Sequence, residues 1–129
     1  MANILITGIT GLIGSHLSEE LSNLGHTIYG VTRRICSKAN YEAVLVDLAS
    51  EWKISELPSN IDVVYHLAQS EKFRDFPAGA PDVFQVNINS TAKLLDYAKK
   101  IGESSFIYSS SGGVYGNGDK PFLENAPIV

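Results

Sequence analysis

The sequence predicts an α/β fold: a doubly wound parallel sheet of about five strands in the order 3-2-1-4-5, with helices on both faces. Two observations lead to this prediction. Short apolar runs, typical of buried strands, alternate with segments of helical periodicity along the 129 residues. A glycine-rich turn joins the first apolar run to the first helical segment, and many parallel sheets begin with such a connection.

The glycine-rich turn spans Thr7–Gly14, directly after the apolar run Ile4–Ile6 and at the start of a helical stripe. Gly8 permits a tight turn, Gly11 lets the backbone approach a pyrophosphate, and Gly14 lets the helix pack closely on its strand. The helix then presents free N–H groups to phosphates. A plain strand-to-helix turn is the alternative, because the spacing is not the commonest fingerprint, but the flanking strand and helix favour dinucleotide binding.

Composition excludes several other classes of protein. The chain suits one domain with a real core, and its 44% hydrophobic and 19% charged content is ordinary for a globular protein. A net charge of −4 without a basic run excludes nucleic acid as the expected partner, and no run approaches the ~20 apolar residues of a membrane span. Cys36 is the only cysteine, so no disulfide and no metal site are expected. No basic residue precedes the first strand, so we expect no signal peptide and a cytoplasmic location.

The second predicted strand, His26–Thr32, ends in two arginines, Arg33 and Arg34. An NAD site usually has an acidic residue near this position, which binds the ribose 2′-hydroxyl. No acidic residue occurs between Thr27 and Asn40. Two cations suit a 2′-phosphate instead, so the sequence favours NADP over NAD. The alternative is a pair of solvated arginines at the start of a loop.

The third predicted strand, Ala43–Val46, is followed by Asp47 and Leu48. The Asp47 carboxylate suits an adenine amine, and it equally suits the cap of a short predicted helix, Ser50–Leu57. The residues leave these two alternatives open.

The fourth predicted strand is Asp62–His66, and Leu67-Ala68-Gln69 follows it. The small and apolar residues of this tripeptide let a cofactor lie against the backbone. His66 is expected to be a hydrogen-bonded structural histidine rather than an acid or base. Ser70–Pro81 is a loop of mixed charge at the carboxyl edge of the sheet, where a lid or substrate loop is expected.

The longest helical pattern is Asp82–Ile101. Its predicted inner face consists of Phe84, Asn87, Thr91, Leu94, Leu95 and Ala98. Asn87 is polar on this stripe and near the start of the helix. It is either a satisfied buried amide or part of the site, and we slightly favour the site.

The fifth predicted strand, Ser105–Ser109, opens into a run of serines and glycines that ends at Gly116. These hydroxyls are expected to face the same crevice as the glycine turn, although by itself a polar turn is the safer interpretation. Residues 1–116 are predicted to be the dinucleotide-binding domain, and residues 117–129 a loop or tail.

Five motifs, in order along the chain, resemble those of one protein family. They are Thr7–Gly14 (Thr-Gly-x-x-Gly-x-x-Gly), Asp47-Leu48, His66-Leu67-Ala68, Asn87 with Ser90-Thr91 and Leu94-Leu95 (Asn-Val-x-Gly-Thr-x-Asn-Leu-Leu), and Ser109–Gly116 (Ser-Ser-x-x-x-Val-Tyr-Gly). The family is the extended short-chain dehydrogenase/reductases, which are NAD(P)-dependent sugar-nucleotide epimerases and dehydratases with a Rossmann-like domain. Gly25–Arg34 looks most like the GDP-mannose dehydratase branch, which uses NADP.

The resemblance and the turns together imply a set of site residues. Ser111, three residues before Val114, matches the catalytic Ser/Thr. The expected cofactor-binding residues are Gly8, Thr10, Gly11, Leu12, Ile13, Gly14, Arg33, Arg34, Asp47, Leu48, Leu67, Ala68, Gln69, Asn87 and Ser109. The expected partner is a nucleotide-sugar substrate of the complete enzyme, and the long helix lies where the family usually forms homodimers.

The departure from the family concerns catalysis. The family's catalytic pair is Tyr-x-x-x-Lys, whose tyrosine moves a proton on the sugar hydroxyl. None of the six tyrosines has a lysine four residues later, and the resemblance puts that pair and the substrate-binding lobe beyond Val129. We therefore expect the N-terminal, cofactor-binding portion of an epimerase, dehydratase or reductase, inactive alone. The alternatives are a free-standing NADP(H)-binding or sensing module, and an NADP reductase of the same superfamily acting on a non-sugar carbonyl.

Overall fold

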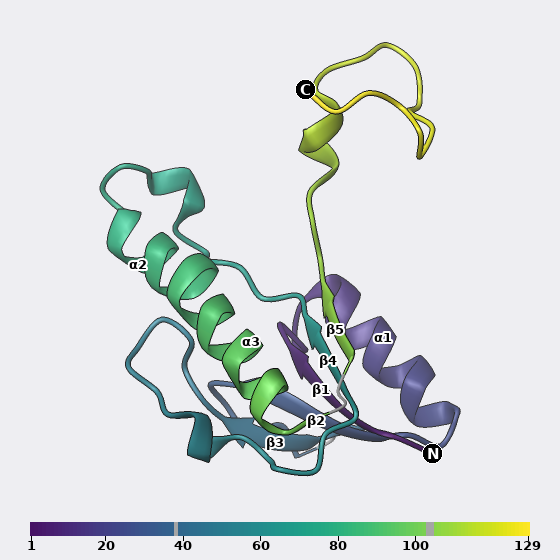
Figure 1. The fold of residues 1–129 in the computed structure, drawn as a ribbon, viewed down its shortest axis with the longest axis vertical. Coiled ribbons are helices and arrows are strands. Elements are labelled where there is room, and N and C mark those ends of the chain that lie inside the picture. The colour runs from purple at the N-terminus through teal and green to yellow at the C-terminus, as the bar shows by residue number, and fades with distance from the viewer. Residues whose placement is uncertain (38, 103–104) are drawn as a thin grey trace.

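The computed structural model describes residues 1–37, 39–102 and 105–129, which form a five-stranded parallel sheet (Figure 1). Its order, β3-β2-β1-β4-β5, confirms the predicted fold class and strand order. The strands are β1 (Asn3–Thr7), β2 (Thr27–Thr32), β3 (Glu42–Leu45), β4 (Val63–His66) and β5 (Ser105–Tyr108). Each predicted strand end lies within one residue of the observed end.

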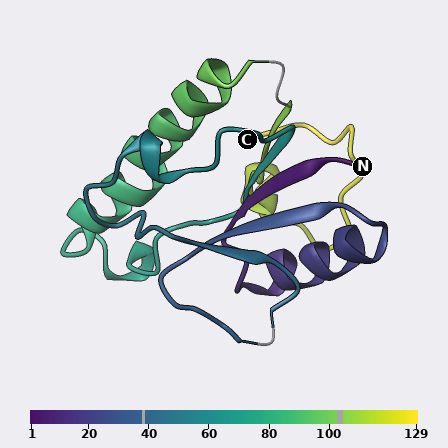
Figure 2. The same ribbon diagram turned by 90° about the horizontal axis from the view of Figure 1, so that it is seen from below.

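Helices cover both faces of the sheet (Figures 1 and 2). One face carries α1 (Leu12–Asn23), and the other carries a long helical segment made of α2 (Ala80–Phe84), the π-helix η3 (Gln85–Ser90) and α3 (Thr91–Lys100). Single 3-10 turns are η1 (Ile54–Glu56), η2 (Phe73–Asp75) and η4 (Gly112–Tyr115). No helix among the described residues is long and apolar enough to cross a membrane.

The central strand divides the core into two layers. Successive side chains of a strand point to opposite faces, so Ile4 and Ile6 pack on the α1 side with Leu17, while Leu5 packs on the α3 side with Leu94. The three β1 side chains are at most 3% exposed. Burial on both faces explains why β1 reads as a continuous apolar run.

The predicted helix Ser50–Leu57 is wrong. Only the single turn η1, Ile54–Glu56, is helical there. Trp52 and Leu57 are both buried, and their spacing does not place them on one face of an α-helix. Packing of these two side chains therefore overrides the short helical pattern.

The long helical segment confirms the predicted Asp82–Ile101 helix, but its predicted inner face is wrong at Phe84 and Leu95. These two side chains are 51% and 49% exposed, while Val86 and Tyr97 are buried. Leu95 lies at the edge of the α3 face that buries Leu94 and Ala98. For Phe84 the reason is η3, because hydrogen bonds in a π-helix span one residue more than those of an α-helix. The extra residue per turn rotates α2 relative to the periodicity that α3 follows.

The chain after β5 extends away from the sheet (Figure 1). The edge strand β5 is itself poorly covered, since Ile107 and Tyr108 are 41% and 54% exposed. Only the turn η4 is regular among the described residues after Tyr108. The division of the chain at residue 116 stays a prediction.

Candidate cofactor site

A cleft of about 950 Å³ opens at the carboxyl ends of the strands, beside β1, where the strand order reverses toward β4. Ligands of doubly wound sheets bind at this point. The predicted site residues that line the cleft are Gly8, Thr10, Gly11, Arg33, Arg34, Asp47, Leu48, Leu67, Ala68 and Gln69. The fold therefore brings the ends of four strands, predicted separately from the sequence, to one cavity.

The three glycines of the turn have different structural roles. Gly8 has a φ of 70°, and a Cβ there would lie 2.8 Å from the Ala68 nitrogen. A Cβ on Gly14 would overlap the Gly8 carbonyl oxygen, so Gly14 allows α1 to pack on the turn. A Cβ on Gly11 would approach only that same oxygen, at 3.2 Å, and Gly11 lines the cleft. The geometry fits a tight turn with one glycine facing a ligand.

The N-terminus of α1 is available to an anion. Gly11 is its N-cap and provides no side-chain hydrogen bond, and the first turn has no acidic residue. The amide groups of that turn and the positive end of the helix dipole suit a phosphate. Leu12 and Ile13 are 80% and 61% exposed at this helix start and do not line the cleft. If they bind the cofactor, they do so through their backbone N–H groups.

The two arginines after β2 lie in a tight turn at the cleft. The Thr32 hydroxyl donates to the Arg34 carbonyl over 3.1 Å and accepts the Arg34 N–H over 3.2 Å. Arg33 Nη2 forms an ion pair with Glu71 Oε1 at 3.0 Å, and these side chains are 54% and 78% exposed. Glu71 lines the cleft too. The β2 and β4 edges of the cleft are therefore joined by one exposed ion pair.

Asp47 holds its own turn. Its Oδ1 accepts the Ala49 N–H over 2.9 Å, and its carbonyl accepts the Ser50 N–H over 3.1 Å. No helix begins at Ser50, so the carboxylate shapes the turn rather than capping a helix. Asp47 also lines the cleft, which leaves the adenine contact as a proposal.

His66 is buried, 1% exposed, and both ring nitrogens are hydrogen-bonded. Thr91 Oγ1 donates to the Asn87 carbonyl over 2.8 Å, so it must accept from His66 Nε2–H, 2.8 Å away. His66 Nδ1 therefore accepts from Thr7 Oγ1, at 2.6 Å, and Thr7 Oγ1 accepts the Ala68 N–H. Burial lowers the pKa of His66 to about 4. The geometry fits the predicted structural role, with a neutral ring and no free nitrogen.

Asn87 reaches the β4 loop rather than the cleft. Its Oδ1 accepts the Ser70 N–H over 2.8 Å. The Ser70 hydroxyl in turn donates to the Asp82 carboxylate and accepts the Lys72 N–H. Asn87 is not among the described residues that line the cleft, but it fixes the backbone of a loop that does.

The structure does not bring Ser109 and Ser111 to the cleft lining. The Ser111 hydroxyl accepts the Gly113 N–H over 3.1 Å and caps η4, while the Ser109 N–H donates to the His66 carbonyl. Both serines are exposed in the segment that leaves the sheet (Figure 1). Their roles stay predictions.

Several lining residues were missed by the sequence analysis. They are Val31, Thr32, Ile35, Cys36, Ser37, Tyr41, Val46, Ala49, Asp82 and Val86. Ser70, Glu71 and Lys72 also line the cleft, and they belong to the loop expected at this edge from the sequence. Four of the missed residues, Ile35, Cys36, Ser37 and Ala49, closely follow a predicted strand, so the carboxyl-edge rule applied to a few further residues per strand would have found them. Tyr41 carried no such signal in the sequence; in the structure its ring packs over Gly30 of β2, where a Cβ would lie 2.5 Å from it.

The parallel sheet, and a cleft that opens beside a glycine turn at its switch point, define a dinucleotide-binding protein of the Rossmann class. Comparison with known proteins narrows this class. The model of the NAD dependent epimerase/dehydratase family matches residues 4–128. The chain belongs to this family, which confirms the resemblance drawn from the motifs.

The relatives include enzymes of nucleotide sugars. UDP-N-acetyl-alpha-D-glucosaminuronate decarboxylase from Bacillus cytotoxicus is 33% identical over 129 residues, covering 94% of this chain and 40% of the relative. The structure of a UDP-glucose-4-epimerase from Stenotrophomonas maltophila, with bound NAD and formylated UDP-arabinopyranose, matches with a TM-score of 0.80 and 28% identity, over 100% of this chain and 43% of that one. The structure of a short-chain dehydrogenase/reductase superfamily protein from Agrobacterium tumefaciens with bound NAD matches with a TM-score of 0.79 and 30% identity, over 98% of this chain and 39% of that one. The chain therefore spans less than half the length of these relatives.

Proposed function

We propose that this chain is the NAD(P)-binding portion of a sugar-nucleotide epimerase, dehydratase or reductase. The observation that carries the proposal is the glycine turn, whose Gly11 faces a cleft at the switch point of the sheet. Relatives named for UDP-sugar reactions support the substrate class. When bound, the nicotinamide cofactor supplies the hydride acceptor or donor for the sugar carbon.

Each part of the cleft suits one part of the cofactor. The glycine turn and the N-terminus of α1 suit the pyrophosphate. The turn at Asp47 and Leu48 lies on the β2 side of β1. In this fold, the adenosine half of a dinucleotide binds on that side. The backbone of Leu67 and Ala68 lies against the glycine turn, close enough to Gly8 to exclude a side chain there. In the complete enzyme, Ser111 polarises the substrate oxygen.

We propose NADP rather than NAD as the preferred cofactor. The absence of an acidic residue between Thr27 and Asn40, together with Arg33 and Arg34 at the cleft, supports this preference. The two neighbouring solved structures contain NAD. The ion pair with Glu71 means that a 2′-phosphate must exchange with a carboxylate on Arg33.

We propose that these 129 residues bind the cofactor without converting a sugar nucleotide. No tyrosine has a lysine four residues later. His66 cannot substitute as a base, because both of its ring nitrogens are bonded and its pKa is lowered to about 4. A free-standing NADP(H)-binding or sensing module is the second candidate, supported by a cleft whose lining residues all lie between Gly8 and Val86.

We also propose that the chain forms a homodimer through its long helical segment. Phe84, Ile88 and Leu95 are each about half exposed along it. Large apolar side chains that remain exposed along one helical segment favour self-association. Calorimetric titration with NAD⁺ and NADP⁺ tests cofactor binding, and sedimentation tests the dimer.

A further inference from the structure

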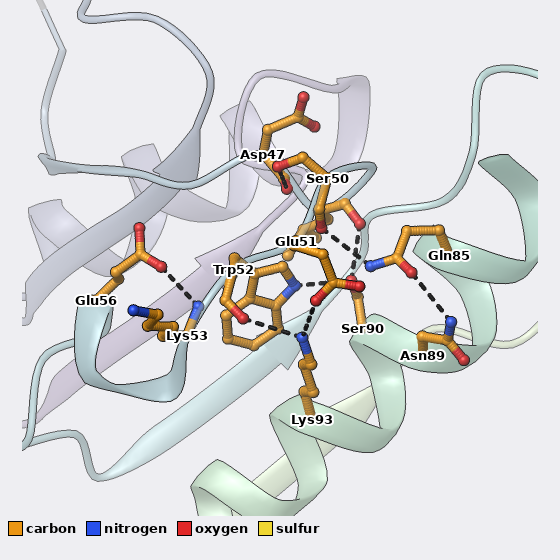
Figure 3. Close-up of polar contacts among 11 residues, drawn as sticks. Asp47, Ser50, Glu51, Trp52, Lys53, Glu56, Gln85, Asn89, Ser90 and Lys93 are labelled. Atoms are coloured by element: carbon orange, nitrogen blue, oxygen red, sulfur yellow. Dashed lines mark hydrogen bonds and ion pairs between the residues drawn. The ribbon is translucent and has the colours of Figure 1, made fainter.

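The Ser90 hydroxyl lies at the centre of a hydrogen-bonded chain behind the cleft (Figure 3). It donates to the Leu48 carbonyl over 2.8 Å and accepts the Trp52 indole N–H over 2.9 Å. These directions are fixed, because an indole nitrogen only donates and a carbonyl only accepts. Ser90 is 0% exposed, so its single proton is committed to Leu48.

The turn Asp47–Ser50 is held from the helix side by two residues of the π-helix. Ser90 bonds one carbonyl of the turn, and Gln85 Nε2 donates to the Ser50 carbonyl over 3.0 Å. Asn89 Nδ2 donates to Gln85 Oε1, which orients that amide (Figure 3). The helix therefore positions this turn through alternate backbone carbonyls.

The other side of the same turn lines the cleft at Asp47, Leu48 and Ala49. In a doubly wound dinucleotide fold, this side of β1 binds the adenosine half, while the glycine turn binds the pyrophosphate. A bond that fixes the Leu48 carbonyl therefore affects the adenosine half of the site and not the pyrophosphate half. Glycine, which the family pattern has at the position of Ser90, provides no hydroxyl for such a bond.

On the basis of the proposed function, we infer that Ser90 and Trp52 are positioning residues for the adenosine half of the cofactor. Ser90, through its bond to the Leu48 carbonyl, fixes the position of the Leu48 backbone at the wall of the cleft. Trp52 orients the Ser90 hydroxyl by occupying its acceptor side. Neither side chain touches the cofactor, since neither lines the cleft.

Lys93 provides the control within the same network. Its ammonium bonds Glu51 Oε2 at 3.2 Å and the Trp52 carbonyl at 3.0 Å, and lies 5.4 Å from the centre of the indole ring. These bonds end on residues outside the cleft lining. Lys93→Met therefore removes contacts to the Trp52 carbonyl and ring, but it leaves the partners of the Trp52–Ser90 and Ser90–Leu48 bonds in place.

The test compares two small probes, 5′-AMP for the adenosine half and inorganic pyrophosphate for the glycine turn, by NMR titration of the labelled chain. We expect Ser90→Ala to weaken 5′-AMP binding about 3- to 10-fold, because binding must then order a Leu48 backbone that the hydroxyl no longer holds, at a cost of up to about one hydrogen bond. Pyrophosphate binding should be unchanged. Trp52→Phe weakens 5′-AMP by a smaller factor, because the bond to Leu48 remains. Lys93→Met changes neither probe.

Unchanged 5′-AMP binding in both Ser90→Ala and Trp52→Phe would overturn the inference. So would an equal loss of both probes, which a general loss of packing produces. Trp52 is the only tryptophan, so a change in its emission in Ser90→Ala verifies that the bond to the indole is gone. A parent chain that binds neither probe refutes the proposed function itself and is distinct from these outcomes.

Discussion

Lowering the pH is expected to destabilise the fold through His66. The ring is buried and neutral, and burial lowers its pKa from the ordinary 6.5 to about 4. Between these two pH values the unfolded chain binds a proton that the folded chain excludes. The free energy of unfolding therefore falls as the pH falls below 6.5, and the contribution is fully present above it.

The size of the effect follows from the two pKa values. Taking 6.5 for the unfolded chain and about 4 for the folded chain, lowering the pH from 7 to 5 removes about 2 kcal/mol. Protonation also puts a hydrogen on Nδ1, where the Thr7 hydroxyl donates. That contact must then reverse, although Thr7 Oγ1 already accepts the Ala68 N–H.

The assay is urea unfolding at pH 7 and pH 5, with the parent and His66→Gln. The glutamine amide keeps one donor and one acceptor but does not titrate. We expect the parent to lose about 2 kcal/mol more than the variant between these two pH values. Equal losses in the two proteins would refute the assigned neutral, buried state of His66.

Three further predictions address the cofactor, the dimer and the chemistry. Glu71→Gln should tighten NADP⁺ binding about two- to fivefold by freeing Arg33 from an exposed ion pair, with NAD⁺ binding unchanged. Glu51→Gln, away from the cleft, is the control. Unchanged NADP⁺ binding in Glu71→Gln would refute the proposed exchange of a phosphate for the Glu71 carboxylate on Arg33. Ile88→Lys should abolish self-association in sedimentation, whereas Leu24→Lys, at another exposed leucine, should not; a dimer that survives Ile88→Lys contradicts the proposed interface. Incubation with NADPH and UDP-, GDP- and dTDP-sugars should give no product by chromatography, because a positioned acid–base group typically contributes ~10²–10⁴ in rate, and any turnover contradicts the proposal.

The fold was predictable because each strand is a short apolar run and each strand end carries a turn signal. Ile4–Ile6 and the glycines after it specify the first β-α unit almost unaided. The chain order of strands and helices then leaves few topologies. These are local signals, and the structure confirms them within one residue at every strand end.

The parts that could not be predicted depend on long-range contacts. The pair Arg33–Glu71 and the bond Trp52–Ser90 each join residues 38 positions apart, so no local pattern reveals them. The π-helix is hidden for another reason: one extra residue in a turn shifts the helical phase without changing residue types. The sequence likewise left open whether Asn87 is a satisfied amide or part of the site; its amide oxygen accepts the Ser70 N–H, and a role in cofactor binding stays a prediction.

The most direct test of the central claim is cofactor affinity in Gly11→Val. Gly11 lines the cleft, and a Cβ there would approach only the Gly8 carbonyl oxygen, at 3.2 Å, so this oxygen must shift slightly for the fold to accept the change. The added branch should then occupy space proposed for the pyrophosphate. Calorimetry should show binding of NAD⁺ or NADP⁺ by the parent and none by the variant, whose circular dichroism stays that of the parent. Equal affinity in a folded Gly11→Val variant would contradict the proposal that this turn binds a dinucleotide.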